Sequence, residues 1–189
     1  MQALSTQFAP LSAAHARSTP TDLIFQEKLT LTGDGAAVTD EDGTVLFRIK
    51  AKLMSVSARR ELADASGAVI AGARMKKTPG LHAAVYIGPE SNEKLMMVKA
   101  KGLRDITKCD VDIYLNDKVV GEACGNWRAK TFDVKINGQL AGQMTRKSTT
   151  AKGILFGADA YHVAVAPNVD LACMALLICA LDEIYHDER

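Results

Sequence analysis

Near its C-terminus the chain carries eleven consecutive apolar residues, 171–181, so a helix built from them would have no polar face. Pro167 ends the extended segment before this run, and Asn168 is a good N-cap. Asp170 falls in the first turn, where the helix dipole favours a carboxylate. We therefore predict a helix at about residues 169–185, roughly 25 Å long at about 1.5 Å per residue.

The apolar run is too short to cross a bilayer, which takes about 18 to 20 apolar residues. Runs of about 10 to 14 apolar residues more often belong to buried helices. A helix that is apolar all round must be surrounded by protein. The sequence therefore predicts a buried helix and no transmembrane segment.

The chain before this helix has the pattern of a series of short strands. Apolar or alternating runs are separated by turn dipeptides such as Ser66-Gly67, Asn116-Asp117 and Asn137-Gly138. Twelve strands are predicted, at about residues 23–31, 36–40, 44–52, 57–64, 68–77, 82–88, 95–102, 108–115, 118–125, 132–136, 139–148 and 160–167. The turns recur without a fixed period, which indicates antiparallel hairpins and not a solenoid.

Such a sheet has two edges, and closing it into a barrel removes both. Strands of eight residues would rise about 26 Å, which matches the predicted helix length. We therefore predict a mainly β protein, a closed twelve-stranded antiparallel β-barrel around a buried hydrophobic C-terminal α-helix. Residues 21–189 would form this barrel domain. Residues 1–20, rich in Ser, Thr and Ala and without an acidic residue, are expected to be a disordered or surface-draped leader.

The cysteines are Cys109, Cys124, Cys173 and Cys179. Their spacing does not suit zinc, and without a secretory signal reduced thiols are expected. A two-residue turn at Asn116-Asp117 would place Cys109 opposite Cys124, close enough for a disulfide. A three-residue loop would turn Cys124 away and keep charged residues off the apolar face of the hairpin. We favour the second register, and the choice depends on one residue in the loop.

Three segments together closely resemble the LURP-one-related family: LTLTGDGAAVTDEDGTVLFRIKAKLMSVSARRELADASGAVI, WRAKTFDVKINGQLAGQMTRK and ADAYHVAVAPNVDLACMALLICALDEI. The resemblance runs from about Thr21 to the end of the chain. It implies the tubby C-terminal-like fold, a twelve-stranded barrel around a central C-terminal helix. The same superfamily includes the tubby proteins, which bind phosphoinositides, and the phospholipid scramblases, which bind calcium. Some family members are linked to plant defence, without an established biochemical activity.

The scramblase likeness raises the question of a calcium site. Asp159 and Asp170 match acidic positions of the scramblase segment before the helix, whereas Gly157 and Asn168 replace two of its carboxylates. Calcium takes about six to eight oxygen ligands, several of them carboxylates. We therefore expect no bound metal and no cofactor, and interpret Asn168 and Asp170 as caps of the helix.

Basic residues of one predicted hairpin form the candidate binding site for anionic lipid. Alternation places Arg59, Arg74 and Lys76 on the outer face, and a two-residue turn at Ser66-Gly67 would set Arg59 opposite Arg74. Like charges facing each other across a hairpin are mildly destabilising, so an anionic partner would explain them. Such clusters also occur on ordinary solvated faces. Arg60 has the parity of the apolar residues and is expected to mark an end of the barrel.

Motifs for catalysis and for nucleic-acid binding are missing from the sequence. G-x-S-x-G, P-loop and H-E-x-x-H patterns do not occur. The net charge of +1 gives no overall field for nucleic acid or membranes, and ten aromatic residues (five Phe, four Tyr, one Trp) are few for base stacking. Nucleic acid is therefore not the expected partner.

We expect a non-enzymatic intracellular binding or scaffold module that binds phosphoinositides or anionic membrane surfaces. Its expected location is the cytoplasm, with peripheral membrane binding or a nuclear location as variants. The alternatives are a protein-interaction module in defence or signalling and a membrane-tethered, transcription-related regulator, the latter by analogy with tubby-like proteins alone.

Overall fold

The computed structural model describes residues 1–26, 36–51, 59–76, 84–88, 94–101, 109–126, 128–145 and 160–186. The strands are β1 (Thr21–Gln26), β2 (Ala36–Thr39), β3 (Val45–Ala51), β4 (Arg59–Asp64), β5 (Val69–Lys76), β6 (Ala84–Gly88), β7 (Met96–Ala100), β8 (Cys109–Leu115), β9 (Lys118–Asn126), β10 (Thr131–Ile136), β11 (Gln139–Thr145) and β12 (Ala160–Val165). The helices are the short 3-10 turn η1 (Ala13–His15) and α1 (Leu171–His186).

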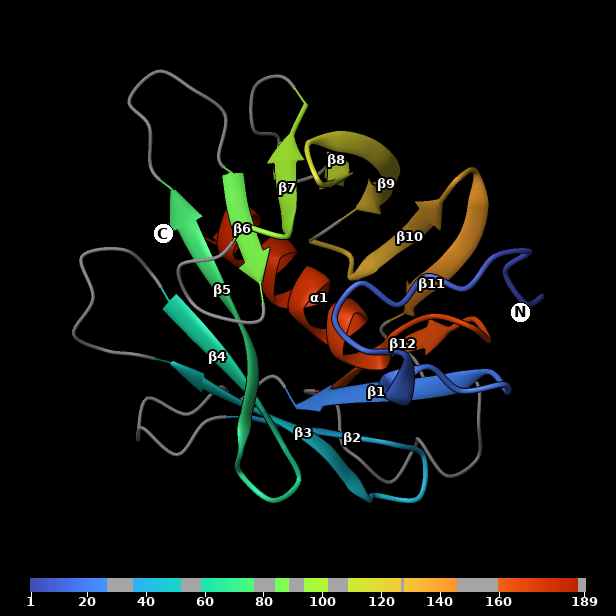
Figure 1. Ribbon diagram of the computed structural model, residues 1–189, viewed down its shortest axis with the longest axis vertical. Helices are drawn as coiled ribbons and strands as arrows, with labels where there is room; N and C mark the ends of the chain where they lie inside the picture. Colours follow the sequence, from blue (N-terminus) through green and yellow to red (C-terminus); the bar gives the residue numbers. More distant parts are fainter. Residues whose placement is uncertain are drawn as a thin grey trace.

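The strands form a closed antiparallel barrel in which each strand pairs with its neighbours in the sequence. Closure is made by β1, which pairs with β12 on one side and with β2 on the other. Figure 1 shows α1 passing through the middle of the ring. The predicted fold class, including the buried C-terminal helix, is therefore confirmed.

Helix α1 is buried along nearly its whole length, because the inner positions of the strands cover it. From Leu171 to Tyr185 every residue except Glu183 is buried. At Gly142 on β11 an added Cβ would lie 2.7 Å from Cε of Met174, so the wall approaches the helix closely here and a larger residue would displace the end of the Met174 side chain. An apolar helix without a polar stripe thus has the all-protein environment that it requires.

The hairpin at Ser66-Gly67 differs from the prediction near its turn. The loop holds three residues between Asp64 and Ala68, with Gly67 at φ +93°, so the two-residue turn was wrong. A register shift between Leu62 and Ala63 then compensates for the extra residue. Arg59 consequently lies opposite Arg74, as predicted.

The hairpin at Asn116-Asp117 has a two-residue turn but the register that was expected from a three-residue loop. Both residues have positive φ, 50° and 63°, as a two-residue type I′ turn requires. A bulge between Ile113 and Tyr114 shifts the register, so that Cys124 lies opposite Asp110 and not opposite Cys109. The favoured register is confirmed, although a bulge and not a longer loop produces it. Cys124 is a free, exposed cysteine.

The enclosure of α1 predicts a specific pattern of thiol reactivity. Burial raises the pKa of the Cys179 thiol to about 12 and that of Cys173 well above its ordinary value. At about pH 8 a maleimide should therefore modify Cys124 and leave Cys173 and Cys179 unmodified until the protein is unfolded in urea, because the thiolate is the reactive form. Site-resolved mass spectrometry measures each thiol separately. Modification of Cys173 or Cys179 in the folded protein as fast as Cys124 would contradict the buried helix.

Candidate functional site

The predicted basic residues occupy neighbouring register positions on β4 and β5. Arg59 on β4 pairs with Arg74 on β5, and Lys76 on β5 lies opposite Ala84 on β6. Ala84 in turn pairs with Lys99 on β7. The structure therefore brings the three predicted residues onto adjoining strands, with Lys99 as a further cation in the same row as Lys76. We call Arg59, Arg74, Lys76 and Lys99 the basic face.

The described surroundings of the basic face contain little opposite charge. Arg74 is half-buried, and no ion-pair partner for it lies among the described residues. Lys99 likewise forms no ion pair among those residues, although its cross-strand neighbour on β8 is the carboxylate Asp112. Glu61, one register position away opposite Lys50 and Gly72, is a carboxylate on the same wall. The basic face thus keeps an excess of positive charge that Glu61 and Asp112 offset in part.

Next to the basic face the sign of the charge reverses. Nζ of Lys101 lies 3.2 Å from Asp110, 3.3 Å from Asp112 and 3.1 Å from Glu122. Burial of the Lys101 ammonium opposes its charge, but hydrogen bonds to Glu122, Asp110 and Asp112 outweigh this and hold the pKa of Lys101 above its ordinary value. One lysine thus serves three carboxylates, so this cluster on β8 and β9 is net negative.

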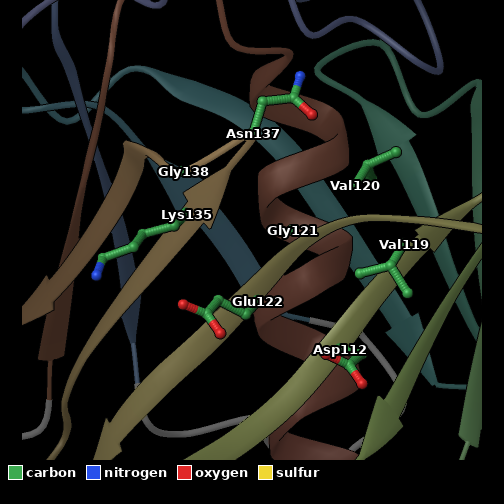
Figure 2. Close-up of a pocket in the computed structure, with 8 residues that line it drawn as sticks. All are labelled: Asp112, Val119, Val120, Gly121, Glu122, Lys135, Asn137 and Gly138. Atoms are coloured by element: carbon green, nitrogen blue, oxygen red, sulfur yellow. The ribbon is translucent and has the colours of Figure 1, made fainter.

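A shallow pocket of about 290 Å³ adjoins the acidic cluster (Figure 2). It is lined by Asp112, Val119, Val120, Gly121, Glu122, Lys135, Asn137 and Gly138. At Gly121 an added Cβ would lie 2.3 Å from the backbone oxygen of Lys135, so this glycine allows β9 to approach β10 closely. The lining offers carboxylates, an ammonium and an amide, which suit polar contact and not nucleophilic chemistry.

The N-terminal end of α1 is held by a buried carboxylate. Oδ1 of Asp170 accepts hydrogen bonds from the backbone N–H groups of Ala172 and Cys173, at 2.9 and 3.1 Å. Oδ2 accepts from the N–H groups of Leu11 and Ser12, at 3.0 and 2.9 Å. Asp170 caps the helix as predicted, but from the position before Leu171 and not from within the first turn. The prediction that Asn168 is a cap was wrong, since its side-chain N–H donates to the oxygen of Leu4 at 3.4 Å. The contacts of Asp170 with residues 11 and 12 were not foreseen.

Residues 1–20 lie across this end of the barrel in the described structure. Leu4 and Phe8 are buried in the core, and Phe8 forms a bridge with Val169. Phe8 N–H donates to the oxygen of Asn168 at 2.9 Å, and Asp170 N–H donates to the oxygen of Phe8 at 2.8 Å. The N-terminal segment is thereby attached to the start of α1 by its backbone.

The described residues do not form a set of ligands for calcium. Both carboxylate oxygens of Asp170 are already occupied by N–H donors. Asp159 and Gly157 lie outside the described residues, and within those residues no three His, Cys, Asp or Glu side chains are grouped to hold a metal.

The other end of α1 is held by Arg60. Its Nε and Nη2 atoms lie 3.1 and 3.0 Å from Oε2 of Glu183, and Nη2 lies 3.5 Å from Oδ2 of Asp182. The expectation that Arg60 marks an end of the barrel is confirmed. Tyr185 adds a contact with the wall, since its hydroxyl accepts the N–H of Asp110 at 2.9 Å.

The barrel filled by its own C-terminal helix sets the class of this protein. Residues 21–182 match the family model described as LURP-one-related. The chain therefore belongs to the LURP-one-related family, as the sequence motifs predicted.

Relatives and a solved structure agree with this assignment. The chain is 33% identical over 176 residues to protein LURP-one-related 10 of Arabidopsis thaliana, covering 87% of this chain and 90% of that one. It is 28% identical over 182 residues to LURP-one-related 15 of the same plant, covering 90% and 82%. An X-ray structure of an Arabidopsis thaliana protein matches with a TM-score of 0.68 at 23% identity, covering 93% and 98%, which supports the fold alone. No helix within the described residues is long and apolar enough to span a membrane.

The Asp170 contacts predict a measurable loss of stability. Asp170→Ala should lower the free energy of unfolding by about 2 to 4 kcal/mol, because buried N–H groups at the helix start and in residues 11–12 lose their acceptor. Urea unfolding measures this, and trypsin should cleave after Arg17 faster in the variant. Asp133→Ala is the matched control, since Asp133 lies on β10 and accepts one solvent-exposed hydrogen bond, from the Gln143 side chain, which contributes about 1 kcal/mol or less. Equal losses in the two variants would rule out this role of Asp170.

Proposed function

We propose that this protein is a non-enzymatic intracellular binding module whose basic face binds anionic phospholipid headgroups at a membrane surface. The observation that carries the proposal is the cross-strand pair of Arg59 and Arg74 on β4 and β5. Two like charges directly opposite each other destabilise a hairpin, and a phosphate between them would remove that cost.

The surroundings of Arg59 and Arg74 favour neutralisation by a bound anion over neutralisation by carboxylates of the same chain. Lys101 shows how this barrel compensates a cation, with three carboxylates within 3.3 Å. Arg74 has no such carboxylate in the described part of the chain. Its cross-strand neighbours are Arg59 and Tyr86, and Lys76 follows two residues on along the same strand. Guanidinium groups bind phosphate in a bidentate manner, which suits a phosphoinositide headgroup.

The barrel also positions these residues in advance. Arg74 stands on a strand paired on both sides, and the neighbouring inward residues Ala71 and Ala73 are buried against the core. A ligand would therefore meet cations held on a rigid wall, so little ordering cost would arise on binding.

A protein-interaction module is the second candidate function. A row of apolar and aromatic residues, Tyr86, Met97, Tyr114 and Val119, follows the register next to Arg74 across β6 to β9. Tyr and Met are enriched at protein interfaces. Lipid binding should weaken with salt and with charge reversal, whereas binding through this apolar row should depend more on its side chains.

Co-sedimentation with liposomes tests the lipid proposal. The protein should bind vesicles that contain phosphoinositides, more strongly at low salt than at physiological salt, and should not bind neutral phosphatidylcholine vesicles. Arg74→Glu should weaken binding by about 2 kcal/mol, roughly thirtyfold, since each cation near the surface contributes about 1 kcal/mol. Arg128→Glu, an exposed position between β9 and β10, is the matched control and should bind like the unaltered protein.

Two outcomes would contradict lipid binding through this face. One is the same affinity for neutral and anionic vesicles. The other is an equal effect of Arg74→Glu and Arg128→Glu while both variants keep the circular dichroism spectrum and melting temperature of the unaltered protein.

A further inference from the structure

The outer faces of β6 to β9 carry an apolar row that follows the strand register. Tyr86 pairs with Met97, Met97 with Tyr114, and Tyr114 with Val119. The first three are half-buried, and Val119 is 59% exposed. Because the intervening residues of these strands are buried against α1, the row lies on the outside of the barrel. Four neighbouring strands therefore present a continuous apolar strip.

A charged row runs beside the apolar row and changes sign between β7 and β8. Lys99 on β7 pairs with Asp112 on β8, and Asp112 pairs with Glu122 on β9. One step further along the strands, Lys101 bonds the backbone oxygen of Asp110 through its N–H. Cations thus stand on β7 and carboxylates on β8 and β9, with the boundary at the middle of the apolar row. Figure 2 shows Asp112, Val119 and Glu122 on the side of β8 and β9 away from α1.

This arrangement is complementary to itself. A two-fold axis parallel to the strands, placed over the boundary between β7 and β8, exchanges left and right across the strands and preserves position along them. Met97 then faces Tyr114 of a second copy, and Tyr86 faces its Val119. Lys99 faces Asp112 of the second copy, and the same contact occurs twice.

We propose that the outer faces of β6 to β9 form the interface of a symmetric dimer of this chain. A second copy satisfies both halves of the surface at once. A basic protein partner would match only the carboxylates of β8 and β9, and an anionic membrane would be repelled by them. The composition, with an apolar centre of Tyr and Met and charges beside it, is that of a protein interface.

The size of the surface sets the expected strength. Four strands about 4.8 Å apart give a strip roughly 15 to 20 Å wide on a convex wall, which is at the small end of specific interfaces. The dimer should therefore be weak and dependent on concentration. Its charged contacts are at a rim open to water, so salt should weaken it.

Sedimentation velocity in the absence of lipid tests this interface, so the result does not depend on the lipid proposal. The unaltered protein should move from monomer toward dimer with increasing concentration at low salt. Lys99→Glu and Asp112→Lys should each weaken the dimer at least about tenfold, because each variant places like charges opposite each other twice. Val119→Asp, at an exposed position of the apolar row, should weaken it similarly. Lys50→Glu on β3 is the matched control and should have no effect.

Mixing the two charge variants separates the interface from effects within one chain. In a mixed pair of Lys99→Glu with Asp112→Lys, both contacts again join opposite charges, so dimers should return. Within each single chain the reversed residue still faces a like charge, so restoration can come only from contact between chains. A protein that stays monomeric at every concentration at low salt, or a mixture that forms no dimer, would overturn the proposal. So would a dimer that Lys99→Glu, Asp112→Lys and Val119→Asp leave unchanged.

Discussion

Helix α1 has no face that water can wet, so protein must cover it on every side. A flat sheet covers one side of a helix, whereas a closed barrel covers all of them and leaves no open edge. Burial of seven large apolar side chains of α1 (Leu171, Met174, Leu176, Leu177, Ile178, Leu181 and Ile184) contributes on the order of 10 to 20 kcal/mol before entropy costs. The barrel and its helix are therefore expected to fold and unfold as one cooperative unit.

A filled interior restricts where this protein can act. The inner positions of the described strands are used for packing against α1, so the interior of the barrel is filled mainly by side chains of the protein itself. Charged chemistry is confined to the ends and the outer wall. At the ends of the barrel the charged residues hold α1: Asp170 caps its N-terminus, and Arg60 pairs with Glu183 near its C-terminus. In the described part of the chain, Arg74 on the outer wall is a charged residue without such a structural contact.

The strands and α1 could be predicted because their signals are local: alternation, turn dipeptides and one unbroken apolar run. The registers were harder, since the bulges before Ala63 and Tyr114 each add one residue that no local rule announces. The predicted pairing of Arg59 with Arg74 was nevertheless correct. The need to keep apolar residues on the inner face constrains the register of a strand more than the turn does. Contacts such as Asp170 with Leu11 or Arg60 with Glu183 join residues more than 100 positions apart, and single-sequence patterns carry no information on them.

The outer wall divides into regions of opposite sign because each strand contributes one parity class of residues to it. On β5 and β7 that class is basic, and on β8 and β9 it is acidic, with Lys101 as the link between them. A random mixture would let each cation find a carboxylate within the chain. Among the described residues Arg74 forms no ion pair with a carboxylate, and this is the basis for proposing a partner outside the chain. Like charges gathered on neighbouring strands lower stability slightly. Their position beside the apolar row of β6 to β9 therefore argues that this part of the outer wall binds a partner.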